Sequence, residues 1–87
     1  MTPNEEIERG ERAQRLLRDP LLLEAFASVK AAIHERWETA PVRDKDGAHE
    51  LKLMLNLLRD VQANLEQAVR NGRFAADSLD KRRFKFF

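Results

Sequence analysis

Between Leu51 and Ala68, apolar residues recur at alternating intervals of three and four positions. This spacing is the a/d pattern of an α-helix that buries one seam against another helix. The seam consists of Leu51, Met54, Leu58, Val61, Leu65 and Ala68. Since no other part of the chain carries recognisable chemistry, the seam indicates a protein that works by contact, without identifying the partner.

We predict that the seam belongs to a helix over about residues 48–70, which ends at Asn71-Gly72, a favourable left-handed C-cap. Leu53 and Leu57 lie away from the seam and Leu55 flanks it, so the helix is apolar almost all round for about two turns. One partner helix covers only one side, and exposed leucine costs about 25 cal/mol per Å². This surplus of uncovered apolar helix surface favours a homo-oligomer. The alternative is a monomeric three-helix bundle in which the first helix covers Leu53 and Leu57.

Two further helices are expected upstream. Thr2-Pro3-Asn4-Glu5 has the residue types of a capping box and predicts a helix over about residues 3–18. Asp19-Pro20 ends that helix and begins the next, over about residues 20–39. The second helix carries an apolar stripe of Leu22, Phe26, Val29, Ile33 and Trp37. The first helix has little apolar surface and a central Gly10, so we expect it to be a solvated or partner-facing arm, loosely tied to the rest.

The expected fold is all-α, with a single small domain over residues 1–87. A short polar loop separates the second and third helices, which predicts an antiparallel helical hairpin. The chain contains 87 residues and no cysteine, so disulfides and thiolate metal sites cannot supplement its limited core. The limited core of such a short chain favours oligomerisation.

Composition argues against several functional classes. Charged residues make up 36% of the chain but nearly cancel to a net charge of +1, so there is no overall basic field for nucleic acid. No apolar run approaches the roughly 18 residues that span a membrane, and the N-terminus lacks the apolar core of a secretory signal. His34-Glu35 and His49-Glu50 are adjacent pairs that point about 100° apart on a helix, so neither pair converges on one atom. We expect no catalytic residue, metal or cofactor.

Residues 73–87 form a basic, phenylalanine-rich segment that we treat as a candidate docking tail. They contain five cationic residues, two acidic residues and four of the five phenylalanines. A short helix over 75–81 and a strand-like alternation over 84–86 are expected. Three interpretations are open: docking into a protein groove, packing over the end of the hairpin, or binding phosphates and bases of nucleic acid. The candidate contact residues are Lys81, Arg82, Arg83, Phe84, Lys85, Phe86 and Phe87.

The helical pattern resembles a group of small, largely uncharacterised helical proteins encoded near the packaging and head genes of tailed phages and prophages. The resemblance rests on Glu8-Arg9-Gly10-Glu11-Arg12-Ala13, Leu16-Leu17, Asp19-Pro20-Leu21, Ala25-Phe26, Trp37, the Leu51–Leu58 run and Asn71-Gly72-Arg73-Phe74-Ala75. The resemblance covers most of residues 5–76. It indicates a phage or prophage context but assigns no site residues. The Arg82–Phe87 ending departs from the group. The resemblance implies the host cytoplasm or an assembled virion as the location.

These observations predict a non-enzymatic structural or accessory protein of phage type, acting through self-association and protein contact. The alternatives are a nucleic-acid-binding packaging or regulatory protein that uses the tail, and a small inhibitor directed at a host factor. The predicted oligomer or partner interface comprises Leu51, Leu53, Met54, Leu55, Leu57, Leu58, Val61, Leu65, Phe26 and Trp37.

Overall fold

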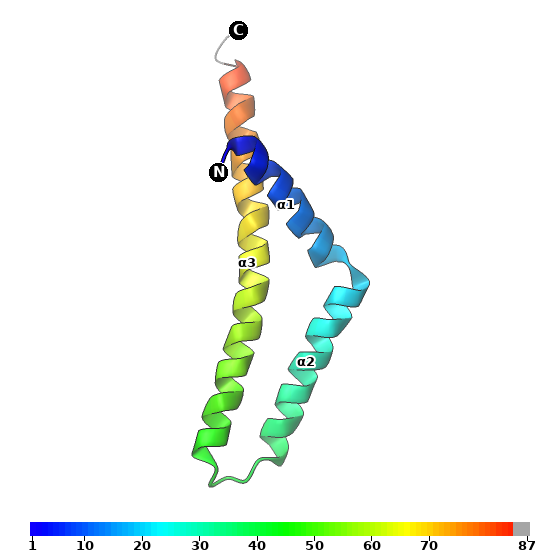
Figure 1. The fold of residues 1–87 in the computed structure, drawn as a ribbon, viewed down its shortest axis with the longest axis vertical. Helices are drawn as coiled ribbons and strands as arrows, with labels where there is room; N and C mark the ends of the chain where they lie inside the picture. The colour runs from blue at the N-terminus through cyan, green and yellow to red at the C-terminus, as the bar shows by residue number, and fades with distance from the viewer. Residues whose placement is uncertain (85–87) are drawn as a thin grey trace.

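The computed structural model describes the backbone of residues 1–84 and the side chains of residues 1–81. It contains three helices, α1 (Pro3–Arg18), α2 (Pro20–Thr39) and α3 (Lys45–Phe84), and no strand within the described backbone. The all-α prediction is confirmed. As Figure 1 shows, α2 and α3 run antiparallel from a loop at one end of the molecule, and α1 lies against the other half of α3.

The molecule is a rod whose length is set by α3. This helix has 40 residues and therefore spans about 60 Å at 1.5 Å per residue. The principal extents are 68 × 25 × 16 Å and the radius of gyration is 19.0 Å, against about 12 Å expected for a compact domain of this length. A rod of this kind has little interior. Among the described residues only Ala13, Ile33 and Ala75 form the buried hydrophobic core.

The starts of α1 and α2 follow the predicted caps. The Thr2 hydroxyl accepts a hydrogen bond from the Glu5 backbone N–H (3.2 Å) and donates one to Glu5 Oε1 (3.1 Å). Asp19 Oδ1 accepts from the Leu21 backbone N–H (2.9 Å), and the Asp19 backbone N–H donates to the Leu16 carbonyl (3.2 Å). Asp19 therefore closes α1 and opens α2, and it fixes the direction in which α2 leaves.

Replacing Asp19 with alanine is expected to cost about 1 kcal/mol of unfolding free energy, because the first turn of α2 loses its side-chain acceptor. For a chain of this size that loss lowers the thermal midpoint by roughly 4–8 °C. Thermal unfolding followed by circular dichroism measures it. Asp19→Asn is the matched control, because asparagine caps as well as aspartate and should leave the midpoint nearly unchanged.

The predicted bounds of the third helix, 48–70, are wrong at both ends. The helix begins at Lys45, because Asp44 Oδ1 accepts from the Gly47 backbone N–H (2.8 Å) and caps the first turn. It then continues through Asn71-Gly72, and no glycine in the described chain has a positive φ. The predicted short helix over 75–81 is part of α3. Phe84 is also helical, in contrast to the predicted alternation over 84–86, of which residues 85 and 86 lie outside the described part.

Gly72 has a packing role instead of a capping role. It is buried where α1 crosses α3, directly against Gly10. A Cβ added at Gly10 would lie 2.9 Å from the Ala68 carbonyl oxygen and 3.0 Å from the Gly72 Cα. A Cβ at Gly72 would likewise lie 3.0 Å from the Glu6 carbonyl oxygen. The two glycines therefore let the helix backbones touch, which larger residues would prevent.

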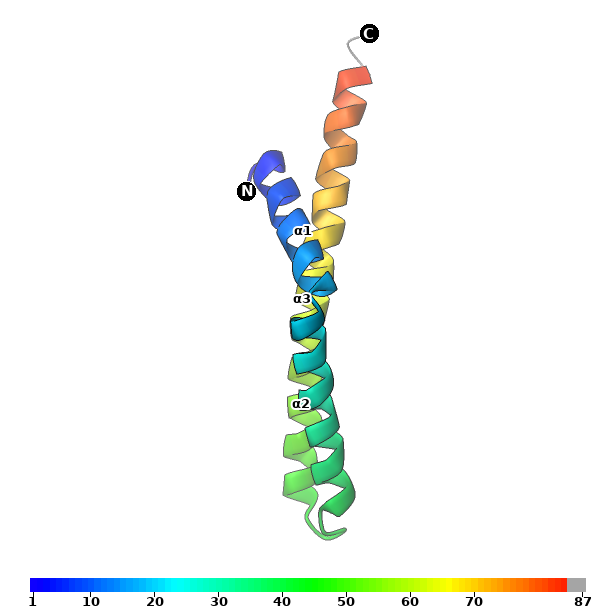
Figure 2. The same ribbon diagram turned by 90° about the vertical axis from the view of Figure 1, so that its right-hand side faces the viewer.

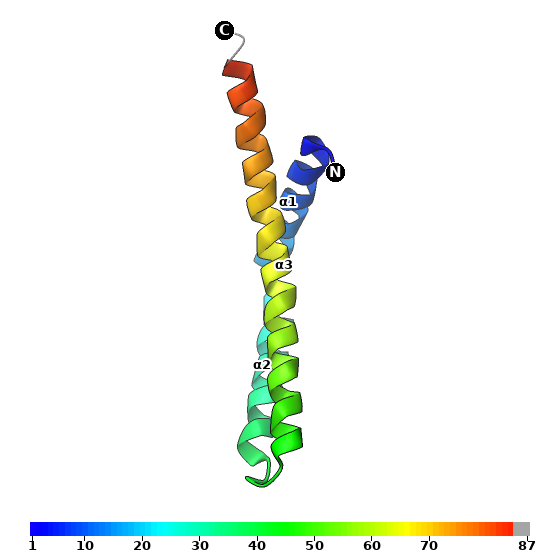
Figure 3. The same cartoon turned by 90° about the vertical axis from the view of Figure 1, so that its left-hand side faces the viewer.

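The expectation that α1 is a loosely tied arm is wrong. Its contact with α3 is the most extensive helix–helix contact in the described chain, with Ala13 and Ala75 buried beside the glycine crossing. In the two opposite side views the N-terminal end of α1 lies away from α3 (Figures 2 and 3), whereas in Figure 1 its C-terminal end does, so α1 crosses α3 at an incline. Small residues at the crossing compensate for the modest apolar surface of α1, because they bring the backbones into van der Waals contact.

The contact between α2 and α3 in the hairpin is less extensive than the contact between α1 and α3. Of the predicted α2 stripe, only Ile33 is buried, whereas Leu22 and Phe26 are half-buried and Val29 and Trp37 are exposed. The antiparallel hairpin is therefore present, but α2 covers α3 incompletely along its length.

Candidate interaction surface

Four apolar side chains form an exposed row on α3, here called the outer stripe. They lie at intervals of one, three and four residues and so share one side of the helix. Their exposed fractions are 48% for Leu53, 42% for Met54, 65% for Leu57 and 50% for Val61. The alternative in which α1 covers Leu53 and Leu57 within one chain does not occur, because α1 packs at Gly72 instead.

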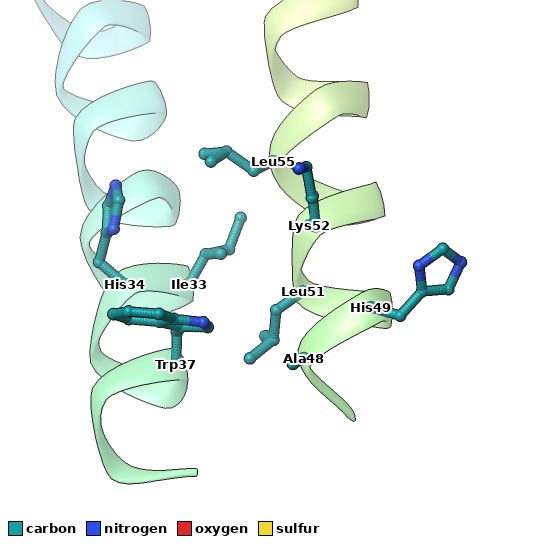
Figure 4. A pocket seen from close by; sticks show the side chains of 8 residues that line it. All are labelled: Ile33, His34, Trp37, Ala48, His49, Leu51, Lys52 and Leu55. Atoms are coloured by element: carbon teal, nitrogen blue, oxygen red, sulfur yellow. The ribbon is translucent and has the colours of Figure 1, made fainter. Parts of the chain in front are cut away.

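The predicted a/d seam is divided in the structure. Leu51, Leu58 and Leu65 are half-buried as a seam requires, but Met54 and Val61 are exposed. Half-buried Leu55 and Gln62 lie on the covered side in their place. The reason is the direction from which α2 approaches: it meets α3 about one position further round the helix, where Leu55 points toward Ile33 (Figure 4).

The seam continues toward the C-terminal end of α3 beyond its predicted limit. The intervals of three and four run on from Ala68 to Gly72, Ala75 and Leu79. There α1 lies over the seam: Gly72 and Ala75 are buried and Ala68 is half-buried. One continuous seam is therefore covered by α1 in its second half and exposed at Met54 and Val61 in its first half.

The opposite side of α3 is polar over the same stretch. Lys52, Asn56 and Arg59 lie at intervals of four and three residues, and all three are exposed. Lys52 and Arg59 lie roughly half a turn from the centre of the outer stripe, and Asn56 lies nearer its edge. This arrangement separates an apolar face from a solvated one. The outer stripe is thus a defined face of the helix and not a scatter of isolated apolar residues.

A second apolar feature is a groove of about 480 Å³ between α2 and α3, near the connecting loop. Ile33, Leu51 and Leu55 point into the space between the two helices, and Trp37 borders it from α2 (Figure 4). His49 points away from α2, so the two histidines of the chain do not converge. The groove offers apolar contact without a paired acid and base. The remaining lining residues are His34, Ala48 and Lys52.

Other predicted site residues are placed as follows. Phe26 is half-buried and Trp37 is 61% exposed, both on α2. Lys81 is exposed on the last described turns of α3. The backbone of residues 82–84 continues α3, but the side chains of Arg82, Arg83 and Phe84 and all of Lys85, Phe86 and Phe87 lie outside the described residues.

Two features of the surface and the packing were not predicted from the sequence. Phe74 is 74% exposed although it was not among the predicted interface residues, and the Gly10–Gly72 crossing was not foreseen. A glycine inside a helical pattern is a weak signal of close packing, and Gly10 carried it, whereas Gly72 stood at the predicted helix end, where a C-cap accounts for it.

The chain exposes much more surface than a compact protein of its size. Its accessible surface is 7574 Å², about 2,300 Å² more than the roughly 5,300 Å² expected for a folded monomer of 10.1 kDa. A stable protein–protein interface buries about 1,200–2,000 Å² in total over both partners. The excess is therefore large enough to supply a complete interface on each chain.

Among the helices of the described residues, none carries an apolar stretch of sufficient length to span a lipid bilayer. Nor does that part of the chain contain a group of three or more histidine, aspartate or glutamate side chains that could hold a metal ion. No protein family, characterised protein or solved structure matches this chain. The fold and the surface together define an elongated all-α protein with an exposed apolar helix face.

Proposed function

We propose that this chain is a non-enzymatic structural or accessory protein that acts by helix-mediated self-association and contact with other proteins. The observation that carries the proposal is the outer stripe, in which apolar side chains share one face of α3 and remain exposed. Such a face gains free energy when another apolar surface covers it, at about 25 cal/mol per Å². A role in the packaging or head assembly of a tailed phage is part of the proposal and rests on the sequence resemblance alone.

Sedimentation velocity over a range of micromolar concentrations tests self-association. We expect the weight-average sedimentation coefficient to rise with concentration, because association follows mass action. The midpoint of thermal unfolding should rise over the same range. A monomer at all concentrations that still melts cooperatively would contradict the proposal.

The contribution of the tail is separated from that of the helix face by deleting residues 82–87. If the outer stripe drives association, the shortened chain should sediment as the full chain does and keep the same helicity. Loss of association with helicity intact would instead assign self-association to the tail.

A further inference from the structure

We propose that the groove between α2 and α3 binds a small amphipathic anion, a molecule with an unbranched hydrocarbon chain and a carboxylate head. The hydrocarbon chain would lie in the groove and the carboxylate at its basic edges. This inference goes beyond the proposed function, because it assigns a ligand site within one chain. Two observations support it: the size and lining of the groove, and the charge of its edges.

The groove has the size and lining of a small-molecule site. Its volume of about 480 Å³ falls within the range of about 300–1,000 Å³ that is typical of ligand pockets. Ile33, Leu51 and Leu55 point into it, and Trp37 at its border is 61% exposed (Figure 4). From Ala48 to Leu55 the groove follows α3 for about 10 Å. A short hydrocarbon chain has this length, and its binding would remove these apolar side chains from water.

The polar residues at the groove are basic. Among its described lining they are His34, His49 and Lys52, and none is acidic. His34 and Lys52 each follow a residue that faces the groove, so they border it, one on α2 and one on α3. Exposed Lys30 and Arg59 continue the same two edges, four positions before His34 and seven after Lys52. A carboxylate at this rim would have an ionic partner in Lys52 and a hydrogen-bond donor in His34, whereas a cationic head would be repelled.

The groove and the outer stripe lie on opposite sides of α3. Leu53 and Leu57 of the stripe are two positions before and two after Leu55, which places them roughly half a turn from the groove. A partner that covers the outer stripe therefore leaves the groove open. Ligand binding and self-association can be measured separately for this reason.

Trp37 is the only tryptophan of the chain, so its fluorescence reports on the groove directly. Decanoate, kept below the concentration at which it forms micelles, is titrated against the full chain. We expect the emission to shift to shorter wavelength and to saturate at one molecule per chain, because the bound molecule shields Trp37 from water. Octanoate should bind about 15-fold more weakly, since each methylene contributes about a factor of four. Decyltrimethylammonium, which has the same chain length and the opposite charge, should bind more weakly than decanoate.

Filling the groove tests its place in binding. Ala48→Phe puts a large side chain at the half-buried lining residue of α3 and should weaken decanoate binding about 15-fold or more, as loss of two methylene contacts would. Ala63→Phe is the matched control, because it adds the same side chain at an exposed position outside the groove. Circular dichroism checks that both variants stay helical, and Ala48→Leu replaces Ala48→Phe if the larger side chain prevents folding.

Reversing the charge at the rim tests the head group. Lys52→Glu should weaken decanoate binding about threefold to tenfold, because an exposed ion pair is lost and a repulsion replaces it. The same variant should bind decyltrimethylammonium more tightly than the unsubstituted chain does. Lys81→Glu is the matched control, since it makes the same change at an exposed position near the other end of α3 and should alter neither affinity.

Several results would overturn the proposal. Equal affinity for decanoate and decyltrimethylammonium would remove the role of the basic edges, and equal binding by Ala48→Phe and Ala63→Phe would place decanoate elsewhere. Binding to phosphatidylglycerol vesicles without binding to monomeric decanoate would assign the edges to a lipid surface. A Trp37 emission that shifts with protein concentration, in the absence of any probe, would place a second copy in the groove. Leu57→Asp keeps this inference apart from the proposed function, because that variant should bind decanoate as the unsubstituted chain does, whatever its state of association.

Discussion

Replacing Gly10 with alanine is expected to lower the thermal midpoint, although glycine-to-alanine changes inside a helix normally raise it. Helix propensity alone favours alanine by about 1 kcal/mol. At this position the new Cβ would meet the Ala68 carbonyl oxygen at 2.9 Å and the Gly72 Cα at 3.0 Å, and both are backbone atoms. Relieving such overpacking costs about 1–3 kcal/mol, so after the gain in helix propensity the net destabilisation is up to about 2 kcal/mol.

The effect should grow with the size of the side chain. Gly10→Leu forces α1 away from α3 and is expected to cost about 3 kcal/mol or more of unfolding free energy. In a chain of this length, that loss lowers the midpoint by roughly 12–24 °C. Thermal unfolding followed by circular dichroism measures both variants at one protein concentration.

The matched control is Ala27→Gly, an exposed position inside α2 that reports ordinary helix propensity. It should lower stability by about 1 kcal/mol, the usual sign for glycine inside a helix. If Gly10→Ala proved about 1 kcal/mol more stable than the unsubstituted chain, as helix propensity alone would make it, the close crossing of α1 and α3 would be refuted.

Local signals in the sequence predicted the local structure well. The N-caps at Thr2 and Asp19 involve hydrogen bonds to residues two or three positions away, so the residue types and their spacing suffice to identify them. The polar loop and the two flanking helices were predicted for the same reason. The antiparallel hairpin then followed from the shortness of the loop.

The end of the third helix could not be predicted in this way. Asn71-Gly72 fits a C-cap, but glycine also occurs where two backbones approach closely. Which role applies depends on Gly10, which is distant in the chain and meets Gly72 only after folding. A tertiary contact thus overrode a local preference, and the helix continued for three further turns.

For the candidate surface too, the sequence predicts one part and tertiary packing decides the other. The surplus of leucine predicted that α3 would remain partly uncovered, and the exposure of Leu53 and Leu57 agrees with that prediction. Which half of the seam stays exposed depends on where α1 and α2 approach. Since the crossing at Gly72 directs α1, the exposure of Met54 and Val61 is a consequence of packing that spacing alone does not reveal.

The second large effect is expected from Leu57→Asp, which should convert an associated chain into a monomer. Leu57 is 65% exposed within one chain, so its replacement removes little from the monomer. Self-association through the outer stripe, as proposed above, would bury Leu57 of both copies. Fully burying a leucine contributes about 1.5–3 kcal/mol, so two copies, each already about one-third buried, contribute roughly 2–4 kcal/mol.

Losing this 2–4 kcal/mol of association free energy raises the dissociation constant by about 30- to 1,000-fold. Burying the two new carboxylates would weaken association further. Sedimentation equilibrium measures it directly. Asn56→Asp is the matched control, because it adds the same charge at the neighbouring position on the polar face of α3. The control should associate as the unsubstituted chain does, so that a difference between the two variants reports the face of the helix and not its net charge.

Gly10→Leu and Leu57→Asp together separate folding from association. Gly10→Leu acts where α1 meets α3 within one chain, so it should lower the midpoint even under conditions where the chain is monomeric. Leu57→Asp should leave the monomer's midpoint nearly unchanged and abolish its dependence on protein concentration. If Leu57→Asp instead unfolded the isolated chain, Leu57 would belong to the core of the single chain, and the outer stripe would not be a surface available to a partner.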